Sequence, residues 1–290
     1  MPRQKIIFKS ESELDQMRLT GYHARRIVLA MAERVAVGVT TGEINDICRR
    51  ELGLIGGIGM SKNYPTYKPG EGYPAESCIS INEEIVHGIP GPRKLKEGDI
   101  VTLDLAMKLG SYCADNAITV GVGRLPPEKK KLLDITKATL DYAIENAEPG
   151  VKWSEIAREM QKMAEKKGYG VIRDFVGHGI GRTMHEDPKV PNFTNAEQRK
   201  GDFVLRPGMT FAVEPMCVVG KPDVKTLSDN WTIVTRKRKP ACHFEHTLSI
   251  TETGCDVLTD GRPPASLIEG PVKTERPSPV LDEGLAAVAA

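Results

Sequence analysis

The sequence has few cysteines, and none of them are arranged in a way that would hold a structure together. Six cysteines are spread over 290 residues, with no C-x-x-C pair and no tight cluster. This distribution predicts reduced thiols and argues against a disulfide framework or a zinc knuckle. Any metal in this protein must therefore be held by oxygen and nitrogen ligands.

Long apolar runs are also absent. No segment approaches the ~18 consecutive apolar residues of a membrane span. The start, Met-Pro-Arg-Gln-Lys, lacks the apolar core of a signal peptide. We therefore expect a cytoplasmic protein with no membrane partner.

The net charge is small. A formal charge of +1 gives no sign of a DNA or membrane partner. Residues 129–131 and 236–239 form two short basic runs, which we interpret as a solvated helix start and a solvated hairpin tip. The alternative is a docking patch for an acidic partner such as ribosomal RNA. No helix has a coiled-coil pattern or a second apolar face, so we expect a monomer.

Patterning predicts an α+β protein. Apolar spacing predicts helices over residues 12–35, 127–147 and 154–167. A capping box at residues 40–43 opens a further helix that ends at Leu54. A glycine- and proline-rich loop covers 56–74. Strands are predicted over residues 77–86, 100–107, 112–122, 211–219, 231–235 and 243–251.

One domain, residues 1–262, is expected to contain all of these elements. Five prolines and many small residues follow, so residues 263–290 are predicted to be a disordered tail.

A faint internal repeat is also present, because residues 38–44 and 150–156 share four of seven positions. In each half a long helix precedes this segment and an acidic hairpin comes later. Two duplicated halves would place a site on the seam between them.

The predicted hairpin carries two aspartates. With Leu109 and Gly110 as the turn residues, Asp104 lies directly opposite Asp115. Opposed residues share a face of the sheet, with Cβ atoms ~4.5–5.5 Å apart. Carboxylates that close repel each other unless a cation lies between them. The alternative is a pair of exposed aspartates in a twisted hairpin.

Two histidines follow in a glycine-rich stretch. Gly177, Gly179 and Gly181 alternate around His178, and His185 comes soon after. Alternating glycines disfavour a regular helix and let the backbone pack closely around a group. We therefore expect both histidines on a loop, as site residues or as core histidines bonded to the backbone.

Two glutamates lie inside apolar strands. Glu214 follows Phe-Ala-Val, and Glu245 follows Phe244. A single such glutamate is explained by a salt bridge, but two beside two aspartates and a histidine indicate a metal site. Four carboxylates balance two divalent cations, and oxygen and nitrogen ligands suit Co, Mn, Fe(II) or Zn. Two such ions ~3.5–4 Å apart share a bridging hydroxide in hydrolytic enzymes.

These residues belong to blocks that closely resemble the type I methionine aminopeptidases, a family with the pita-bread fold. The resemblance covers residues 8–260, in order and with family-like gaps. Its blocks are Ser77–Glu83 with His87-Gly88-Ile89-Pro90, Gly98–Val101 with Asp104 and Asp115, Gly177–Arg182 with His185, Gly208–Phe211 with Glu214-Pro215, and Glu245-His246-Thr247.

The resemblance implies an enzyme that removes the initiator methionine from nascent proteins and peptides, with a preference for a small second residue. It implies two pseudo-symmetric α/β halves, an antiparallel sheet and a dinuclear metal site on the seam, where a metal-bridging hydroxide attacks the substrate. Nascent polypeptide N-termini are the expected partner, with the ribosome near its peptide exit as a further candidate.

Site roles follow from the resemblance position by position. Asp104, Asp115, His178, Glu214 and Glu245 match the metal ligands. His87 matches a non-ligand histidine near the scissile amide, and His185 matches one that contacts the substrate carbonyl, so both are expected to be catalytic and to bind substrate. Glu214 is our candidate for the base that takes the proton from the nucleophile. Tyr73, Cys78 and Trp231 match the lining of the methionine pocket.

The chain departs from the usual pattern at a few positions. Met184 stands where an aromatic residue is common, which predicts a softer pocket wall. Ala106 and Asn116 replace hydroxyl residues beside the aspartates, which predicts looser support of the ligands. The loop over residues 62–72 is longer than in short bacterial enzymes, so its pocket residues cannot be placed. Two alternatives stay open: an X-Pro aminopeptidase-like hydrolase, and a binding protein without activity on the same fold.

Overall fold

The structure is a computed structural model that describes residues 5–65 and 72–267. Within these two stretches the helices are α1 (Glu11–Glu33), α2 (Thr41–Ile55), α3 (Pro127–Asn146), α4 (Trp153–Lys166), α5 (Ala196–Lys200) and the 3-10 helix η1 (Ala265–Leu267). The strands are β1 (Ile58–Gly59), β2 (Cys78–Ile81), β3 (Glu84–Val86), β4 (Ile100–Leu109), β5 (Tyr112–Gly121), β6 (Tyr169–Val171), β7 (Gly177–Gly179), β8 (Glu186–Val190), β9 (Thr210–Val213), β10 (Met216–Val219), β11 (Val224–Thr226), β12 (Ile233–Thr235), β13 (Ala241–His243), β14 (Glu245–Ile250) and β15 (Cys255–Val257).

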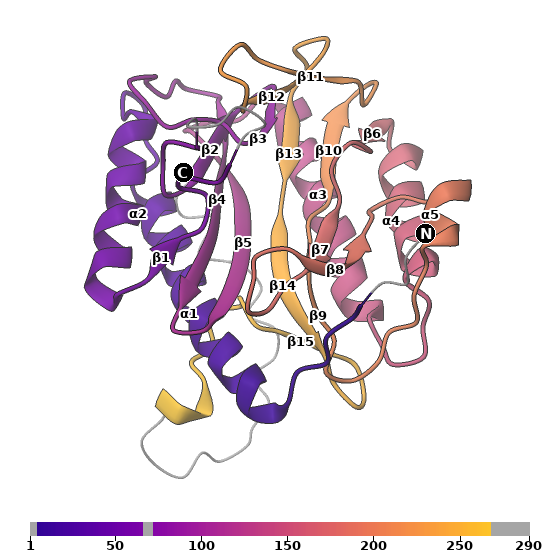
Figure 1. The fold of residues 1–290 in the computed structure, drawn as a ribbon. Helices are drawn as coiled ribbons and strands as arrows, with labels where there is room; N and C mark the ends of the chain where they lie inside the picture. Colours follow the sequence, from indigo (N-terminus) through magenta and orange to yellow (C-terminus); the bar gives the residue numbers. More distant parts are fainter. Residues whose placement is uncertain (1–4, 66–71, 268–290) are drawn as a thin grey trace.

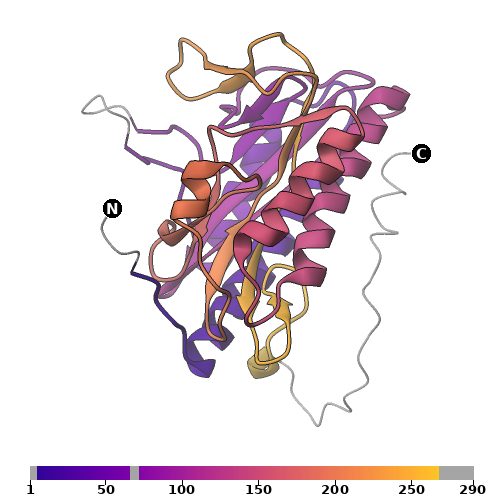
Figure 2. The same ribbon diagram turned by 90° about the vertical axis from the view of Figure 1, so that its right-hand side faces the viewer.

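A nine-stranded antiparallel sheet forms the centre of the molecule. Its order is β1-β4-β5-β14-β9-β7-β8, with β2 paired to β4 and β15 paired to β14. Two three-stranded sheets, β13-β10-β6 and β11-β12-β3, lie beside it. Helices α1 and α2 lie toward one edge of the molecule and α3 and α4 toward the other (Figures 1 and 2). Residues of all four helices share one apolar cluster with the sheet.

Alternation along β4 separates the core from the site. Leu103 and Leu105 are fully buried and belong to the same apolar cluster as Val28 and Met31 of α1. Because successive side chains of a strand point to opposite faces, Asp104 faces away from this cluster. The helices thus cover one face of the hairpin, and the aspartates lie on the other.

The internal repeat has a structural counterpart. Gly38 and Gly150 both have positive φ values, 85° and 90°, just before α2 and α4. Gly38 N donates to Leu95 O at 2.8 Å, and Gly150 N donates to Leu205 O at 2.9 Å. The return bonds, from the amides of these leucines to the residues after the glycines, also match at 2.8 and 2.9 Å. Each half therefore anchors its second helix to the rest of the chain in the same way.

Each of the four predicted helices is confirmed to within two residues at both ends. The capping box holds, because Thr40 Oγ1 accepts from Glu43 N at 3.1 Å and Glu43 Oε2 accepts from Thr40 N at 2.8 Å. Two of the predicted strands are wrong, because each is divided in two. The strand over residues 77–86 is divided into β2 and β3 at Asn82, whose φ of 56° turns the chain. The strand over residues 211–219 is divided into β9 and β10 at Glu214 and Pro215, since proline has no amide hydrogen to donate to a neighbouring strand.

The predicted register of the hairpin is also wrong. Its turn residues are Gly110 and Ser111, so Asp104 lies opposite Ala117, and Asp115 lies opposite Ala106. Gly110 has a φ of 59°, and the first central position of a two-residue hairpin turn favours glycine for this conformation. A shift of two residues keeps both aspartates on one face, as diagonal neighbours.

The predicted tail lies outside the described residues from 268 onward. Residues 263–267 are described, and Ala265–Leu267 form η1. Across 5–65 and 72–267, no helix combines the length and apolar character needed to cross a bilayer.

Candidate metal centre and substrate pocket

A row of side chains crosses four strands on one face of the central sheet. Cys78 pairs with Asp104, Asp104 with Ala117, and Ala117 with Glu245. Paired residues share a face, so the thiol and the two carboxylates point the same way. Asp115 lies two residues before Ala117 and faces the same side. The small alanine leaves space between the acidic groups.

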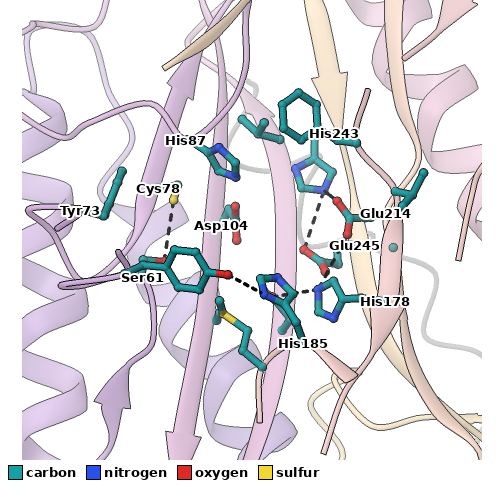
Figure 3. Close-up of a pocket in the computed structure, with 18 of the residues that line it drawn as sticks. Ser61, Tyr73, Cys78, His87, Asp104, His178, His185, Glu214, His243 and Glu245 are labelled. Atoms are coloured by element: carbon teal, nitrogen blue, oxygen red, sulfur yellow. Dashed lines mark hydrogen bonds and ion pairs between the residues drawn. The ribbon is translucent and has the colours of Figure 1, made fainter. Parts of the chain in front are cut away.

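Glu214 and His178 approach this row from the other half. Glu214 directly follows β9, and His178 is the central residue of β7. His178 Nε2 lies 3.9 Å from Asp115 Oδ2 and 3.9 Å from Glu214 Oε1. Figure 3 shows these groups converging from strands of both halves, which is the seam that the repeat predicts.

The prediction of a loop at His178 is wrong, because this residue is in a short strand. The close packing expected of its glycine neighbours is present. A Cβ on Gly177 would lie 2.3 Å from Ala212 O, and one on Gly179 would lie 2.2 Å from Asp187 O. His185 lies in a bend between β7 and β8, outside regular structure as predicted.

Burial changes the acidity of the four carboxyl groups. Desolvation, together with repulsion from neighbouring carboxylates, raises the pKa of Glu214 to about 8 and the pKa values of Asp104 and Glu245 well above their usual range. Desolvation raises the pKa of Asp115 to about 7. Four adjacent carboxylates that are buried or partly buried are costly when all are charged, and bound cations remove this cost.

The donor set fits divalent metal ions. Ligand atoms of Asp115, His178 and Glu245 all lie within 4.8 Å of one another. Asp115 Oδ1 is buried without a hydrogen-bond partner, so it is available as a ligand. His178 Nδ1 lies 2.9 Å from Gly179 O. Because a carbonyl only accepts, the proton is on Nδ1, and the Nε2 lone pair faces the acids.

Burial also keeps the site histidine neutral and the nearby thiol protonated. Desolvation lowers the pKa of His178 to about 4 and raises the pKa of Cys78 well above its usual range. A neutral imidazole binds metals, whereas a thiol must lose its proton to do so. The site therefore offers oxygen and nitrogen ligands, as the cysteine pattern predicts.

Hydrogen bonds from neighbouring strands hold the acidic residues in place. Thr247 Oγ1 accepts from Asp115 N at 2.9 Å and donates to Asp115 O at 2.9 Å. Asn116 Nδ2 donates to Glu245 O at 2.6 Å. The asparagine therefore supplies support of its own beside the aspartate, where the sequence predicted looser support.

His185 and His87 lie at the mouth of the site. The rings of His185 and His178 are 4.4 Å apart and nearly perpendicular. His185 Nδ1 lies 3.1 Å from the Tyr64 hydroxyl. His87 has a φ of 60°, an uncommon conformation for a non-glycine residue that occurs often at functional sites. Its ring packs edge-on against Phe175 at 5.6 Å.

An apolar cluster closes one end of the site. Tyr73, Ala75 and Cys78 are buried together, and Ile89 and Trp231 pack against them. The rings of Tyr73 and Trp231 meet edge to face at 5.2 Å. The Tyr73 hydroxyl is satisfied by Gly88 O at 2.7 Å, so its ring is fixed in the wall.

Comparison with known proteins identifies the family. The sequence profile described as Metallopeptidase family M24 matches residues 15–252. The chain belongs to metallopeptidase family M24. It is 41% identical over 254 residues to a protein from Bacillus subtilis named methionine aminopeptidase 1. The alignment covers 88% of this chain and 99% of that protein.

Solved structures support the fold. The structure of a methionine aminopeptidase from Thermotoga maritima superposes with a TM-score of 0.82 at 35% identity, covering 88% of this chain and 99% of that one. A prolidase from Pyrococcus furiosus has a TM-score of 0.66 at 22% identity, and the match covers 87% of this chain but 65% of the prolidase. The predicted α+β pita-bread fold is therefore confirmed, as is the resemblance to methionine aminopeptidases. Membership of a metallopeptidase family also agrees with a divalent metal cofactor.

All ten predicted site residues of this M24 chain line one cavity of about 680 Å³. They are Tyr73, Cys78, His87, Asp104, Asp115, His178, His185, Glu214, Trp231 and Glu245. The sequence interpretation missed Tyr64 and His243, which line the same cavity. His243 had a signal, because it lies two residues before Glu245 in an extended segment and faces the same side. Tyr64 had none, since its loop has no periodicity.

Proposed function

We propose that this protein is a methionine aminopeptidase that removes the N-terminal initiator methionine from nascent proteins and peptides, with a preference for a small second residue. The observation that carries the proposal is the junction of two environments in one cavity. Four carboxylates, of which Asp115 and Glu245 are buried and Asp104 and Glu214 partly buried, lie with His178 at one end. The apolar Tyr73–Cys78–Trp231 cluster lies at the other. A peptide with an apolar first side chain and a free amine fits this arrangement.

Asp104, Asp115, His178, Glu214 and Glu245 are the proposed ligands of two divalent cations. Co, Mn, Fe(II) and Zn all suit their donor atoms. Two such ions would supply Lewis acidity and a water of lowered pKa. Their combined charge would offset the charges of the four carboxylates.

The proposed catalytic residues act around the scissile amide. Glu214 accepts the proton of the attacking water and passes it toward the leaving amine. His185 donates a hydrogen bond to the oxyanion that forms at the substrate carbonyl. His87 holds the leaving nitrogen or the following backbone.

The proposed specificity comes from the apolar cluster. Tyr73, Cys78 and Trp231 present two rings and a polarisable sulfur to the first side chain of the substrate. Such a lining suits the flexible thioether of methionine, which makes favourable contacts with aromatic rings. Met184 also lines the cavity and adds an adaptable wall.

A nascent chain is the proposed substrate, which sets the reaction in the cytoplasm. The exposed basic run at residues 236–239 supports the further proposal that the ribosome is a docking partner. The other basic run serves the fold at Lys129, which donates to Gly98 O at 2.6 Å and to Asn82 Oδ1 at 2.7 Å.

The two alternative functions are less well supported. The prolidase likeness stands at 22% identity and concerns the fold alone. Relatives named methionine aminopeptidase reach 41% identity over most of the chain. A binding protein without activity would have no need for the five proposed ligands, all of which the chain retains.

Peptide hydrolysis tests the proposal. Metal-stripped protein is assayed on Met-Ala-Ser and Leu-Ala-Ser peptides, with Mn, Co, Fe(II) or Zn added back. We expect cleavage of Met-Ala-Ser alone, restored by metal. Cleavage of an X-Pro peptide in its place would favour the prolidase-like alternative, and no cleavage by protein that binds two equivalents of metal would favour a binding protein.

A further inference from the structure

His243, at the end of β13, is a buried side chain of the cavity with no assigned role. It is 2% exposed, and neither of its ring nitrogens has a hydrogen-bond partner among the described residues. Buried polar atoms of this kind are uncommon in native structures, because each loses its bonds to water without replacement. The described residues therefore supply no hydrogen-bond partner for either nitrogen of this ring.

Two carboxylates lie close to the ring without forming hydrogen bonds to it. His243 Nε2 is 3.7 Å from Glu245 Oε2 and 3.9 Å from Glu214 Oε2, and Figure 3 shows the ring directed at both. These separations exceed hydrogen-bond distances. Two ligands that each lie ~2.0–2.2 Å from one metal ion are separated by at most ~4.4 Å. The spacing therefore suits donor atoms that share a cation.

Glu214 lies between two imidazoles. Its Oε1 is 3.9 Å from His178 Nε2, and its Oε2 is 3.9 Å from His243 Nε2. His178, one of the five proposed ligands, and His243 therefore have the same relation to this carboxylate. The other two cavity histidines have different contacts, since His185 faces the Tyr64 hydroxyl and His87 packs against Phe175.

We propose that His243 is a sixth metal-ligating side chain, which gives the centre two imidazole ligands, one beside each oxygen of Glu214. The inference rests on the metal centre of the proposed function. A neutral imidazole adds a donor without changing the balance between four carboxylates and two divalent cations. Imidazole suits Zn, Fe and Co, whereas carboxylate and water suit Mn. The second imidazole therefore shifts the preference of the centre from Mn toward Zn, Fe(II) and Co.

The test counts imidazole ligands directly. The full-length protein is loaded with Co(II), and the hyperfine-shifted, solvent-exchangeable imidazole N–H protons are counted by proton NMR. We expect two such signals in the unmodified protein, one in His243→Gln and two in the control His87→Gln, which removes a cavity histidine away from the carboxylates. Calorimetry should show that His243→Gln weakens Co(II) and Zn(II) binding about tenfold or more, with a smaller change for Mn(II).

Several results would overturn the inference. One imidazole signal in the unmodified protein would do so even if His243→Gln failed to fold. An unchanged count and affinity in a folded His243→Gln with reduced kcat would assign His243 to positioning of Glu214. The proposed function is judged separately, because failure to cleave Met-Ala-Ser leaves the imidazole count readable.

Discussion

Lys9 Nζ lies 2.7 Å from Glu186 Oε2, and 3% and 7% of the two side-chain surfaces are exposed. The other oxygen, Glu186 Oε1, accepts from Arg182 N at 2.8 Å. The segment before α1 is thereby joined to the bend that contains His185. This ion pair therefore ties the N-terminal segment to the bend that positions His185, a proposed catalytic residue.

Substitution of Lys9 by Met should destabilise the protein by about 3 kcal/mol, because it leaves Glu186 charged and unpaired in a buried site. It should also lower kcat, since the bend beside His185 loses its anchor, while metal content stays unchanged. Urea unfolding and peptide assays measure the two effects. Lys130→Met is the matched control, because the Lys130–Asp134 pair is 69% and 61% exposed and such pairs contribute under ~1 kcal/mol. Equal destabilisation by both variants would contradict this role.

Tyr64→Phe removes the hydroxyl 3.1 Å from His185 Nδ1 and keeps the ring. We expect kcat to fall about five- to tenfold, the value of one hydrogen bond of ~1–1.5 kcal/mol that orients the imidazole. His185→Ala should lower kcat by about 10²–10³ with metal content intact. Adding Tyr64→Phe to His185→Ala should then cost little more. Full additivity in this double-mutant cycle would show that Tyr64 acts elsewhere, and loss of metal from His185→Ala would make His185 a ligand.

Thr247→Val keeps the shape of the side chain and removes both hydrogen bonds to the backbone of Asp115. Because this leaves a buried amide unpaired, we expect a loss of about 1–3 kcal/mol in the free energy of unfolding. We also expect metal affinity to fall about 10–100-fold, since Asp115 is less firmly held. Calorimetric titration with Co(II) measures the affinity. Thr194→Val serves as the control, because Thr194 lies away from the carboxylates and its amide donates to Gln161 Oε1. Unchanged metal affinity in Thr247→Val would show that Asp115 needs no support from Thr247.

The metal-free protein should lose stability as the pH rises from about 6.5 to about 8.5. Burial raises the folded-state pKa of Asp115 to about 7 and of Glu214 to about 8, above the values of unfolded carboxyl groups. A group with a raised folded pKa contributes stability that is lost as the pH rises through that pKa. His178 and His243 act oppositely, because their folded pKa values, about 4 and about 3, lie below the unfolded value. Their contribution is lost as the pH falls below about 6.5, outside this window.

Thermal unfolding in EDTA, compared with Co(II)-loaded protein, measures this dependence. Bound cations favour the ionised carboxylates, so the loaded protein should keep its Tm across the same window. A metal-free Tm that rises steadily from pH 6.5 to 8.5 would contradict the raised carboxyl pKa values.

Local patterns in the sequence predicted a large part of this protein. The Thr40–Glu43 capping box set the start of α2, because a cap is made by residues three positions apart. Burial of Glu245 could be inferred from its apolar neighbours, because it lies in a strand inside the sheet. Glu214 lies between β9 and β10 and is only partly buried. The face shared by Asp104 and Asp115 was predictable even with the wrong register, because a slip of two residues preserves the face.

Only the tertiary structure determined which residues these side chains contact. Gly110 rather than Leu109 begins the hairpin turn, so each aspartate faces an alanine across the hairpin and the carboxylates gain space. The ion pair of Lys9 with Glu186 spans 177 positions, and the contact of Tyr64 with His185 spans 121. No local periodicity encodes such distances, because the folding of two halves around one seam brings these residues together.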